Sequence, residues 1–564
     1  MQRRKFLQVS GFSVAALFFN KFSARAGGTY YQALHFPSMV SVLRNGTWFP
    51  LAGSKERWTL DQLVVDLKHT EGAMGGRGAG EGMSVAVRAP GMALEKIRLS
   101  WGMGFPGTAH YLGDHWERSY GDLGWENVSV SRKAPWYLLI HDGADGGGRM
   151  KGDARRTAAF GVKTGASCFC CWQARSAGLE LVLDTQSGGM GVELGDRTLH
   201  AAEIVTMQGR EGENPFQTDM RFCKIMCDKP RLPDKPVYGI NDWYFAYGNS
   251  SKELILGSTQ MMAELATDTG NRPFSVVDDG WELGADFSRS NSKFGDMSVV
   301  ADGIKKLGMR PGLWTRPLLA KGDDKATRLK PLSNGKTSKE RYLDPTLPEN
   351  LRQIADNIKL YKEWGFEMVK HDYSSYDLFG RWGSKMLEEI TDPGWHFYDR
   401  SKTNAEIILE LYHTIRQAAG TMYLIGCNTM SHLSAGLFEL NRIGDDTSGR
   451  EWERTPKYGV NTMGFRLPQH RTFYAADGDC VGLTTEIPWK LNKQWLQLLA
   501  ESGAPLFISA QQEAMGAEQK DYVKQCFAMA ARVQPTGEPL DWMTNPRPAK
   551  WKLNGRVVEF DWGA

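Results

Sequence analysis

Residues 367–373, with the sequence EMVKHDY, join a short apolar segment to a carboxylate that could do chemistry. Met368 and Val369 predict a buried strand, and Lys370 and Asp372 follow where that strand would end. Catalytic side chains of parallel barrels occupy this position, where the backbone is rigid and the loops open to solvent. A carboxylate beside a lysine should stay ionised and could act as a nucleophile. A structural role for Asp372, as a cap or an ion-pair partner, fits this stretch equally well.

The elements that must position these residues form a repeating pattern in the second half of the chain. Short apolar runs alternate with stretches of helical periodicity, a pattern typical of parallel strands joined by crossover helices. A doubly wound sheet would normally show a glycine-rich first turn, which is not found here, so we favour a (β/α)₈ barrel. The predicted strands are residues 237–240, 274–277, 310–314, 367–369, 422–426, 438–443, a segment around 480–483, and 505–508. The predicted helices are 252–266, 299–307, 350–364, 404–419 and 490–501.

Polar, charged and aromatic residues follow most of these predicted strands. A sugar pocket needs such a mixture, because hydroxyl groups take charged hydrogen-bond partners and the apolar ring face takes an aromatic floor. Two carboxylates on different strands also suit a glycosidase, in which one attacks the anomeric carbon and the other protonates the leaving oxygen. We assign the first role to Asp372 and prefer Asp446 to Asp445 for the second, although spacing leaves that choice open. The other residues at strand ends are Trp243, Asp278, Asp279, Trp281, Trp314, Lys370, Asn428 and Arg442.

Four motifs strengthen this interpretation: VVDDGWE, GLWTRP, EMVKHDYSSYD and NRIGDDTSGREW. They resemble those of the retaining α-galactosidase clan, the melibiase-like glycoside hydrolases, and the resemblance covers the barrel from Tyr238 to about Ser509. The β-rich first half is similar to the N-terminal β-sandwich of the larger, bacterial-type members. The short C-terminus departs from members that carry a full C-terminal β domain.

The resemblance implies a role for each matching residue. The aspartate of the K-x-D motif, Asp372, would be the nucleophile, and the R-x-x-x-D motif points from Arg442 to Asp446 as the acid/base. Asp278 and Asp279 would bind the axial 4-hydroxyl and the 6-hydroxyl of galactose. Lys370 would contact ring hydroxyls, and Arg442 would bind near the 2-position. The ring would be walled by Trp243, Trp281 and Trp314.

The loop after the fifth predicted strand departs from the pattern of galactose-selective relatives, which often carry a bulky or acidic residue there. Asn428 and Ser431 are smaller and uncharged, and would leave room for a 2-acetamido group. We therefore predict an α-galactosidase acting on an oligosaccharide, polysaccharide or glycoconjugate, with an α-N-acetylgalactosaminidase as the alternative. A transglycosylase using the same intermediate and a non-catalytic carbohydrate-binding barrel also stay open. The resemblance implies no metal and no cofactor.

A chain of 564 residues should form two or three domains. We expect a multidomain α/β protein with an export signal at 1–26, a β-sandwich at 27–228, the (β/α)₈ TIM barrel at 229–530 and a short β element at 531–564. Arg3 and Arg4, an apolar run and an A-x-A site predict a twin-arginine-like signal peptide and a periplasmic or secreted protein.

Composition narrows the classes of partner. The net charge of +3, with scattered Lys and Arg, argues against a nucleic-acid-binding surface. No stretch is long and apolar enough to span a membrane, and nothing in the sequence specifies an oligomeric state. The spacing of the eight cysteines does not match a zinc site.

Overall fold

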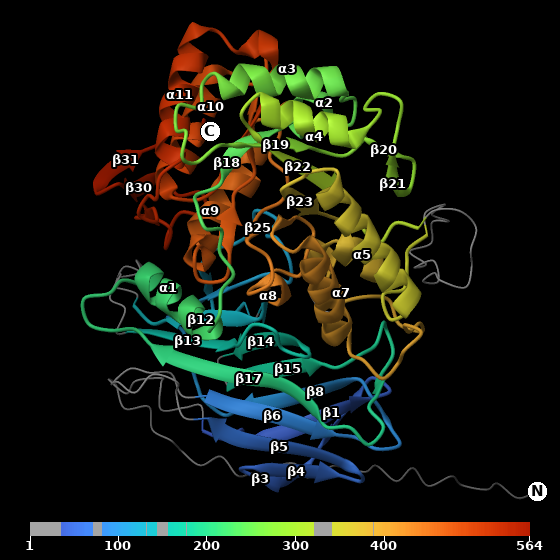
Figure 1. The fold of residues 1–564 in the computed structure, drawn as a ribbon. Helices are drawn as coiled ribbons and strands as arrows, with labels where there is room; N and C mark the ends of the chain where they lie inside the picture. The colour runs from blue at the N-terminus through green and yellow to red at the C-terminus, as the bar shows by residue number, and fades with distance from the viewer. Residues whose placement is uncertain are drawn as a thin grey trace, which may run out of the picture.

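The computed structural model describes residues 35–70, 82–130, 132–143, 156–175, 178–320, 341–386 and 389–563. The predicted signal peptide lies outside these residues. Figure 1 shows two layers of different architecture, with a β domain below a barrel ringed by helices. The fold prediction is confirmed: a TIM-like barrel follows an N-terminal β-rich domain.

Two large antiparallel sheets build the β domain (Figure 1). The smaller sheet has the strand order β11–β14–β15–β8–β1–β2, and the larger has the order β10–β9–β12–β13–β17–β6–β5–β4–β3. Apolar residues alternate with polar ones in strands such as β6, as expected where one face of a sheet is covered. The bounds in the smaller sheet are Met39–Arg44 (β1), Thr47–Pro50 (β2), Lys96–Trp101 (β8), Lys133–Pro135 (β11), Phe169–Arg175 (β14) and Gly178–Asp184 (β15). Those in the larger are Ala52–Ser54 (β3), Arg57–Leu60 (β4), Leu63–Thr70 (β5), Gly82–Arg88 (β6), His110–Gly113 (β9), Glu126–Asn127 (β10), Tyr137–His141 (β12), Thr157–Val162 (β13) and Leu199–Gln208 (β17).

The helix α1 (Pro215–Met226) lies in the region that we predicted to be β-rich. Its start has a physical cause in the sequence: the Asn214 side chain accepts from the Gln217 backbone, and the Gln217 side chain accepts in return. Proline at the first helical position adds to this capping box. The helix packs on β13 and β17 and against residues 467–469, so it lies where the two domains meet.

The barrel sheet has the order β26–β25–β24–β23–β22–β19–β18–β28–β27, with every neighbouring pair parallel. Only Gly478 and Asp479 separate β26 from β27, so these are two halves of one interrupted strand. The first half pairs with β25 and the second with β28, which closes the sheet into an eight-stranded barrel. The bounds are Tyr238–Asn241 (β18), Phe274–Val277 (β19), Arg310–Thr315 (β22), Met368–His371 (β23), Tyr423–Gly426 (β24), Leu440–Arg442 (β25), Ala475–Asp477 (β26), Cys480–Leu483 (β27) and Leu506–Ala510 (β28).

Helices cover the outside of the barrel (Figure 1). The main ones are α3 (Lys252–Ala263), α4 (Met297–Lys306), α5 (Pro348–Glu363), α7 (Asn404–Ala419), α10 (Trp489–Ser502) and α11 (Ala517–Ala530). Short helices occupy the loops: α2 (Trp243–Ala246), α6 (Ser374–Phe379), α8 (Ser431–Ser434) and α9 (Asn461–Arg466). Apolar side chains such as Phe274, Met368 and Phe507 fill the barrel interior, while polar side chains gather at the strand ends.

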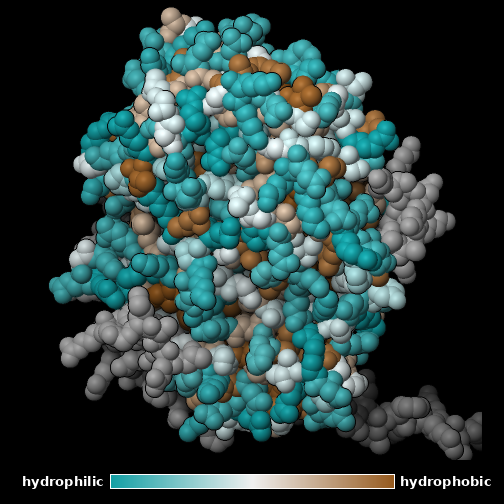
Figure 2. Space-filling model, in the orientation of Figure 1, coloured by the Kyte–Doolittle hydropathy of each residue, from teal (hydrophilic) through white to brown (hydrophobic). Residues whose placement is uncertain are grey.

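A three-stranded sheet ends the chain, made of β29 (Glu538–Pro539), β30 (Lys550–Leu553) and β31 (Arg556–Glu559). Hydrophilic side chains cover most of the face seen in Figure 2, and hydrophobic ones are scattered among them. In the part of the chain that the structure describes, helices are too short or too polar to cross a bilayer.

Candidate active site

A cavity of about 550 Å³ opens at the carboxyl ends of the barrel strands. Its lining brings together eight of the ten residues proposed from the sequence, which come from six different strand ends. They are Trp243, Asp278, Asp279, Trp314, Lys370, Asp372, Asn428 and Asp446.

Asp372 follows β23, and its carboxylate is held by three hydrogen bonds. Its Oδ2 accepts from the indole Nε1 of Trp314 at 3.1 Å, and its Oδ1 accepts from the backbone N–H groups of Tyr373 at 2.7 Å and Asn428 at 3.1 Å. Three N–H donors stabilise negative charge on this carboxylate and fix its orientation. A carboxylate held in one orientation at the wall of a sugar-sized cavity is placed as a nucleophile requires.

The backbone immediately after Asp372 is strained. Tyr373 has φ +64°, a left-handed conformation that costs a bulky residue about 1–3 kcal/mol. The guanidinium of Arg316 lies 4.2 Å from the centre of the Tyr373 ring and forms an ion pair with Asp377. These contacts hold the turn that presents the Asp372 carboxylate to the cavity.

A second acidic group lies at the end of β19. Asp278 accepts from Lys370 Nζ at 2.6 Å and from the Asn241 amide at 2.5 Å, so its charge is balanced by a buried cation. Burial, together with Glu282, Asp278 and Asp372, raises the pKa of Asp279 to about 8. The raised pKa of Asp279 favours its protonated form, in which its hydroxyl could donate a hydrogen bond to a ligand.

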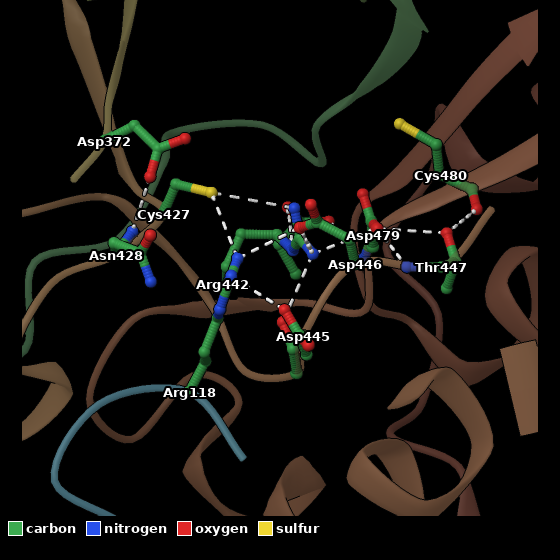
Figure 3. A network of polar contacts seen from close by, with 12 residues as sticks. Arg118, Asp372, Cys427, Asn428, Arg442, Asp445, Asp446, Thr447, Asp479 and Cys480 are labelled. Carbon is green, nitrogen blue, oxygen red and sulfur yellow. Dashed lines mark hydrogen bonds and ion pairs between the residues drawn. The ribbon is translucent and has the colours of Figure 1, made fainter. Parts of the chain in front are cut away.

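The third acidic group is the pair after β25. Asp446 accepts from Arg118 Nη1 at 3.0 Å and from Arg442 Nη2 at 3.1 Å, and Asp445 forms an ion pair with Arg118 Nη2 at 2.7 Å. Burial alone would raise the pKa of Asp446, but Arg118, Arg442 and Lys370 outweigh it and hold that pKa below its ordinary value. Figure 3 shows Asp372 on one side of the arginine groups and this aspartate pair on the other.

Two of the proposed residues do not line the cavity. Trp281 is fully buried and its Nε1 donates to the Trp314 carbonyl oxygen at 2.9 Å, so it supports the wall from behind instead of forming it. Arg442 is 2% exposed and lies beneath Asp446, where it pairs with Asp479 at 2.9 Å. The expectation that both touch a sugar directly is therefore corrected. The residue types at a strand end do not reveal which side chain points inward.

The loop after β24 also differs from expectation. Cys427 and Asn428 line the cavity, but Ser431 is 1% exposed and bonds to the Glu117 carbonyl and the Arg466 guanidinium. Because Ser431 does not line the cavity, its small side chain cannot make room there for a bulky substituent on the sugar. Only Asn428 keeps the predicted position.

Sequence reasoning missed cavity residues from outside the barrel core. Arg118 and Tyr120 belong to the β domain and line the cavity, as do Trp382, Lys457 and Tyr458 from barrel loops. Nothing in the local sequence near Arg118 marks it as part of a site in another domain. The aromatic residues among them supply ring faces of the kind that sugars stack on.

Metal ligands are not grouped in the described part of the chain, where no cluster of three or more His, Cys, Asp or Glu side chains could hold an ion. All eight cysteines lie in the described residues as buried free thiols.

Sequence comparison gives no assignment: no protein-family model matches the chain, and no curated protein matches it. The chain is similar in structure to TtGalA, an α-galactosidase from Thermus thermophilus in complex with p-nitrophenyl α-D-galactopyranoside. The TM-score is 0.59 at 18% identity, over 90% of this chain and 99% of that one. It is also similar to a variant of the GH36 α-galactosidase AgaA from Geobacillus stearothermophilus in complex with raffinose, with a TM-score of 0.60 at 13% identity, over 91% and 79% of the two chains. AgaB from the same organism gives a TM-score of 0.57 at 13% identity, over 88% and 75%. The chain thus shares the fold of these enzymes over most of its length.

Proposed function

We propose that this chain is a retaining α-galactosidase that cleaves terminal α-linked galactose through a covalent glycosyl-Asp372 intermediate. One observation carries the proposal: a carboxylate held by three N–H donors shares one cavity with a second carboxylate group on another strand. A binding protein would have no need for two such groups. The α-galactosidases of similar fold, crystallised with α-galactosides, support the choice of sugar.

Asp372 would attack the anomeric carbon, displacing the leaving oxygen as a carboxyl of the Asp445–Asp446 pair protonates it. Water would then be deprotonated by the same carboxyl and would release galactose with retained configuration. Trp314 and the backbone N–H groups keep Asp372 in place for both steps. Asp278, Asp279 and Lys370 form a hydrogen-bonding group suited to adjacent hydroxyls, because the carboxyl oxygens accept hydrogen bonds and the ammonium donates them.

We keep Asp446 as the proposed acid/base, and Asp445 as its competitor, because both line the cavity. Asp446 is held ionised by two arginines, which suits the base role. It would have to gain a proton in the complex with substrate before it could act as the acid. The Asp445→Asn and Asp446→Asn variants should be compared on 2,4-dinitrophenyl and methyl α-galactosides. The true acid variant should lose little in forming the intermediate from the dinitrophenyl substrate and should form α-galactosyl azide in azide.

The experiment that tests the function is a panel of aryl α-glycosides of galactose, N-acetylgalactosamine and arabinopyranose, with NMR identification of the first anomer released. We expect turnover of the galactoside and release of α-galactose. Turnover of the N-acetylgalactosaminide alone would favour the alternative specificity, for which Asn428 is the one remaining structural argument. Release of β-galactose would contradict the retaining mechanism, and inactivity on the whole panel would contradict the proposed function.

We also propose that the chain is exported to the periplasm or beyond, on the strength of its twin-arginine-like N-terminus. Mass spectrometry of the protein recovered from the periplasmic fraction should find a mature N-terminus near Gly27. Recovery of the intact N-terminus from the cytoplasm alone would contradict this.

A further inference from the structure

The segment Asp114–Tyr120, here called the docking segment, leaves the β domain after β9 and reaches the rim of the barrel. Ser119 forms a parallel bridge with Gly444. Its N–H donates to the Ile443 carbonyl at 2.9 Å, and its own carbonyl accepts from the Asp445 N–H at 2.9 Å. The docking segment therefore extends the ladder of the barrel beyond β25, beside the aspartate pair.

Buried polar contacts anchor the part of the docking segment that precedes Arg118. Asp114 forms an ion pair with Arg466 at 2.8 Å, and both side chains are at most 3% exposed. The Trp116 indole donates to the Met386 carbonyl at 2.9 Å. Glu117 accepts from the Gly383 N–H at 2.7 Å and from the hydroxyl of Ser375, which lies just after the turn at Tyr373. An arginine mounted on this segment cannot move away from the cavity without breaking these bonds.

Arg118 contacts both aspartates that follow β25. Its two terminal nitrogens contact Asp445 at 2.7 Å and Asp446 at 3.0 Å. The Asn428 amide lies between Arg118 and Asp372. When both amide atoms face complementary partners, its oxygen accepts from Arg118 Nε at 3.3 Å and its nitrogen donates to Asp372 Oδ1 at 3.2 Å. One guanidinium thus reaches Asp445 and Asp446 directly, as Figure 3 shows. It reaches the proposed nucleophile through one amide.

We propose that Arg118 is a positioning residue, supplied by the β domain, that fixes the rim aspartates and links them to the nucleophile, so that the β domain is an obligate part of the active site. This rests on the proposed glycosidase function. The planar fork of an arginine can bond two carboxylates at once, whereas a lysine provides a single charged point. Without Arg118, Asp445 and Asp446 would be adjacent like charges, and one of them would take up a proton or turn away.

Several other charged and titratable groups also act on this pair. Asp446 is influenced by Arg442 from β25, Lys370 from β23, Tyr244 from the loop after β18 and Tyr373 from the loop after β23. Asp445 raises the pKa of Glu117 and lies 3.9 Å from Arg454. Arg118 also lowers the pKa of Glu117. The pH profile of an Arg118 variant is therefore read against that of Glu117→Gln, which lacks this titrating carboxyl.

The test compares kcat/KM against pH for wild type, Arg118→Gln, Arg118→Lys and the control Arg132→Gln. Arg132 is a β-domain arginine with its own ion pairs to Asp122 and Glu126 at 2.5 and 3.4 Å, away from the barrel cavity. We expect Arg118→Gln to lose tenfold or more at the wild-type optimum. Its alkaline limb should move to higher pH, because a carboxylic acid freed from a neighbouring cation keeps its proton longer. Arg118→Lys should lose a similar factor with an unshifted limb, because charge is kept and the fork is lost.

Two results would overturn the proposal. One is a profile of Arg118→Gln that superimposes on wild type in both height and shape. The other is an equal loss in Arg132→Gln, which would show a general effect of weakening the β domain. If Arg118→Gln does not fold, the activity of Arg118→Lys tests the proposal instead. Wild-type activity in that variant would show that the two-pronged guanidinium is not needed. If wild type is inactive on the whole glycoside panel, the proposed function fails separately. The crystal structure of Arg118→Gln then tests positioning, which is refuted if Asp445 and Asp446 keep their orientations.

Discussion

Replacing Asp372 by alanine would remove the proposed nucleophile but leave its surroundings in place. The indole N–H of Trp314 and the backbone N–H groups of Tyr373 and Asn428 now lie within 3.1 Å of the carboxylate oxygens. In the variant these three donors would surround an empty, anion-sized site. We expect kcat/KM to fall by at least about 10³-fold, equivalent to ~4 kcal/mol of transition-state stabilisation.

A small anion should restore part of this activity by occupying the vacated site. With p-nitrophenyl α-galactoside and azide, Asp372→Ala should form β-galactosyl azide, because azide would attack from the face that the carboxylate occupied. Adding Trp314→Phe removes one of the three donors. A hydrogen bond to a charged group is worth about 1.5–3 kcal/mol, so the azide concentration for half-maximal rescue should rise about 10- to 150-fold.

The matched control is Asp372→Asn, in which the amide fills the site and leaves no room for azide. It should be as inactive as the alanine variant but should not be rescued. NMR of the azide adduct and initial rates across azide concentrations provide the measurements. Activity of Asp372→Ala above about 1% of wild type, or an α-configured azide product, would refute the role of Asp372.

Three further predictions concern stability. Burial raises the pKa of Glu117 from 4.5 to about 7, so the folded protein holds a proton that the unfolded chain releases, and the stability of the fold falls as pH rises between these values. The melting temperature of Glu117→Gln relative to wild type should therefore increase from pH 5 to pH 8. A difference that stays constant with pH would contradict this. Ser431→Leu should lower the melting temperature, because leucine overpacks the site and the 2.8 Å hydrogen bond from Arg466 is lost. The ratio of activities on galactoside and N-acetylgalactosaminide should not change. A selective loss of activity on one of the two substrates would place the loop at the 2-position after all. Arg416→Met should cost about 3–5 kcal/mol in denaturant unfolding, since it leaves the buried Glu439, now 2.9 Å away, without its buried partner. Glu439 also pairs with the exposed Arg231 at 2.5 Å, and wild-type stability would show that Arg231 alone balances the charge.

The barrel could be predicted because its strands are buried on both faces and therefore appear as short, continuous apolar runs. Each predicted strand corresponds to one in the structure, but the prediction missed the interruption at Gly478–Asp479, although Asp477-Gly478 is a turn signal in the sequence. The polar residues after the strands could be predicted to share one site, because parallel strands bring their carboxyl ends to one rim of the barrel. Helix α1 was missed although the capping box at Asn214 and the proline after it were legible in the sequence.

Finer features of the cavity depend on contacts that leave no local pattern. Trp281 and Trp314 both follow strands, and only packing decides that the first supports the second. Arg118 lies in a polar, loop-like stretch of the β half, and its partners are 327 and 328 residues further along the chain. A contact across that separation can be found only when both domains are seen together.

The docking segment also bears on the order in which this protein gains activity as it folds. Contacts between residues so far apart in the chain form late, because loop-closure entropy opposes them until each domain is largely built. The barrel can therefore regain its helices and strands before the aspartate pair is in place. Refolding followed by both circular dichroism and enzyme activity should show activity returning in a separate, slower phase that corresponds to docking of the two domains.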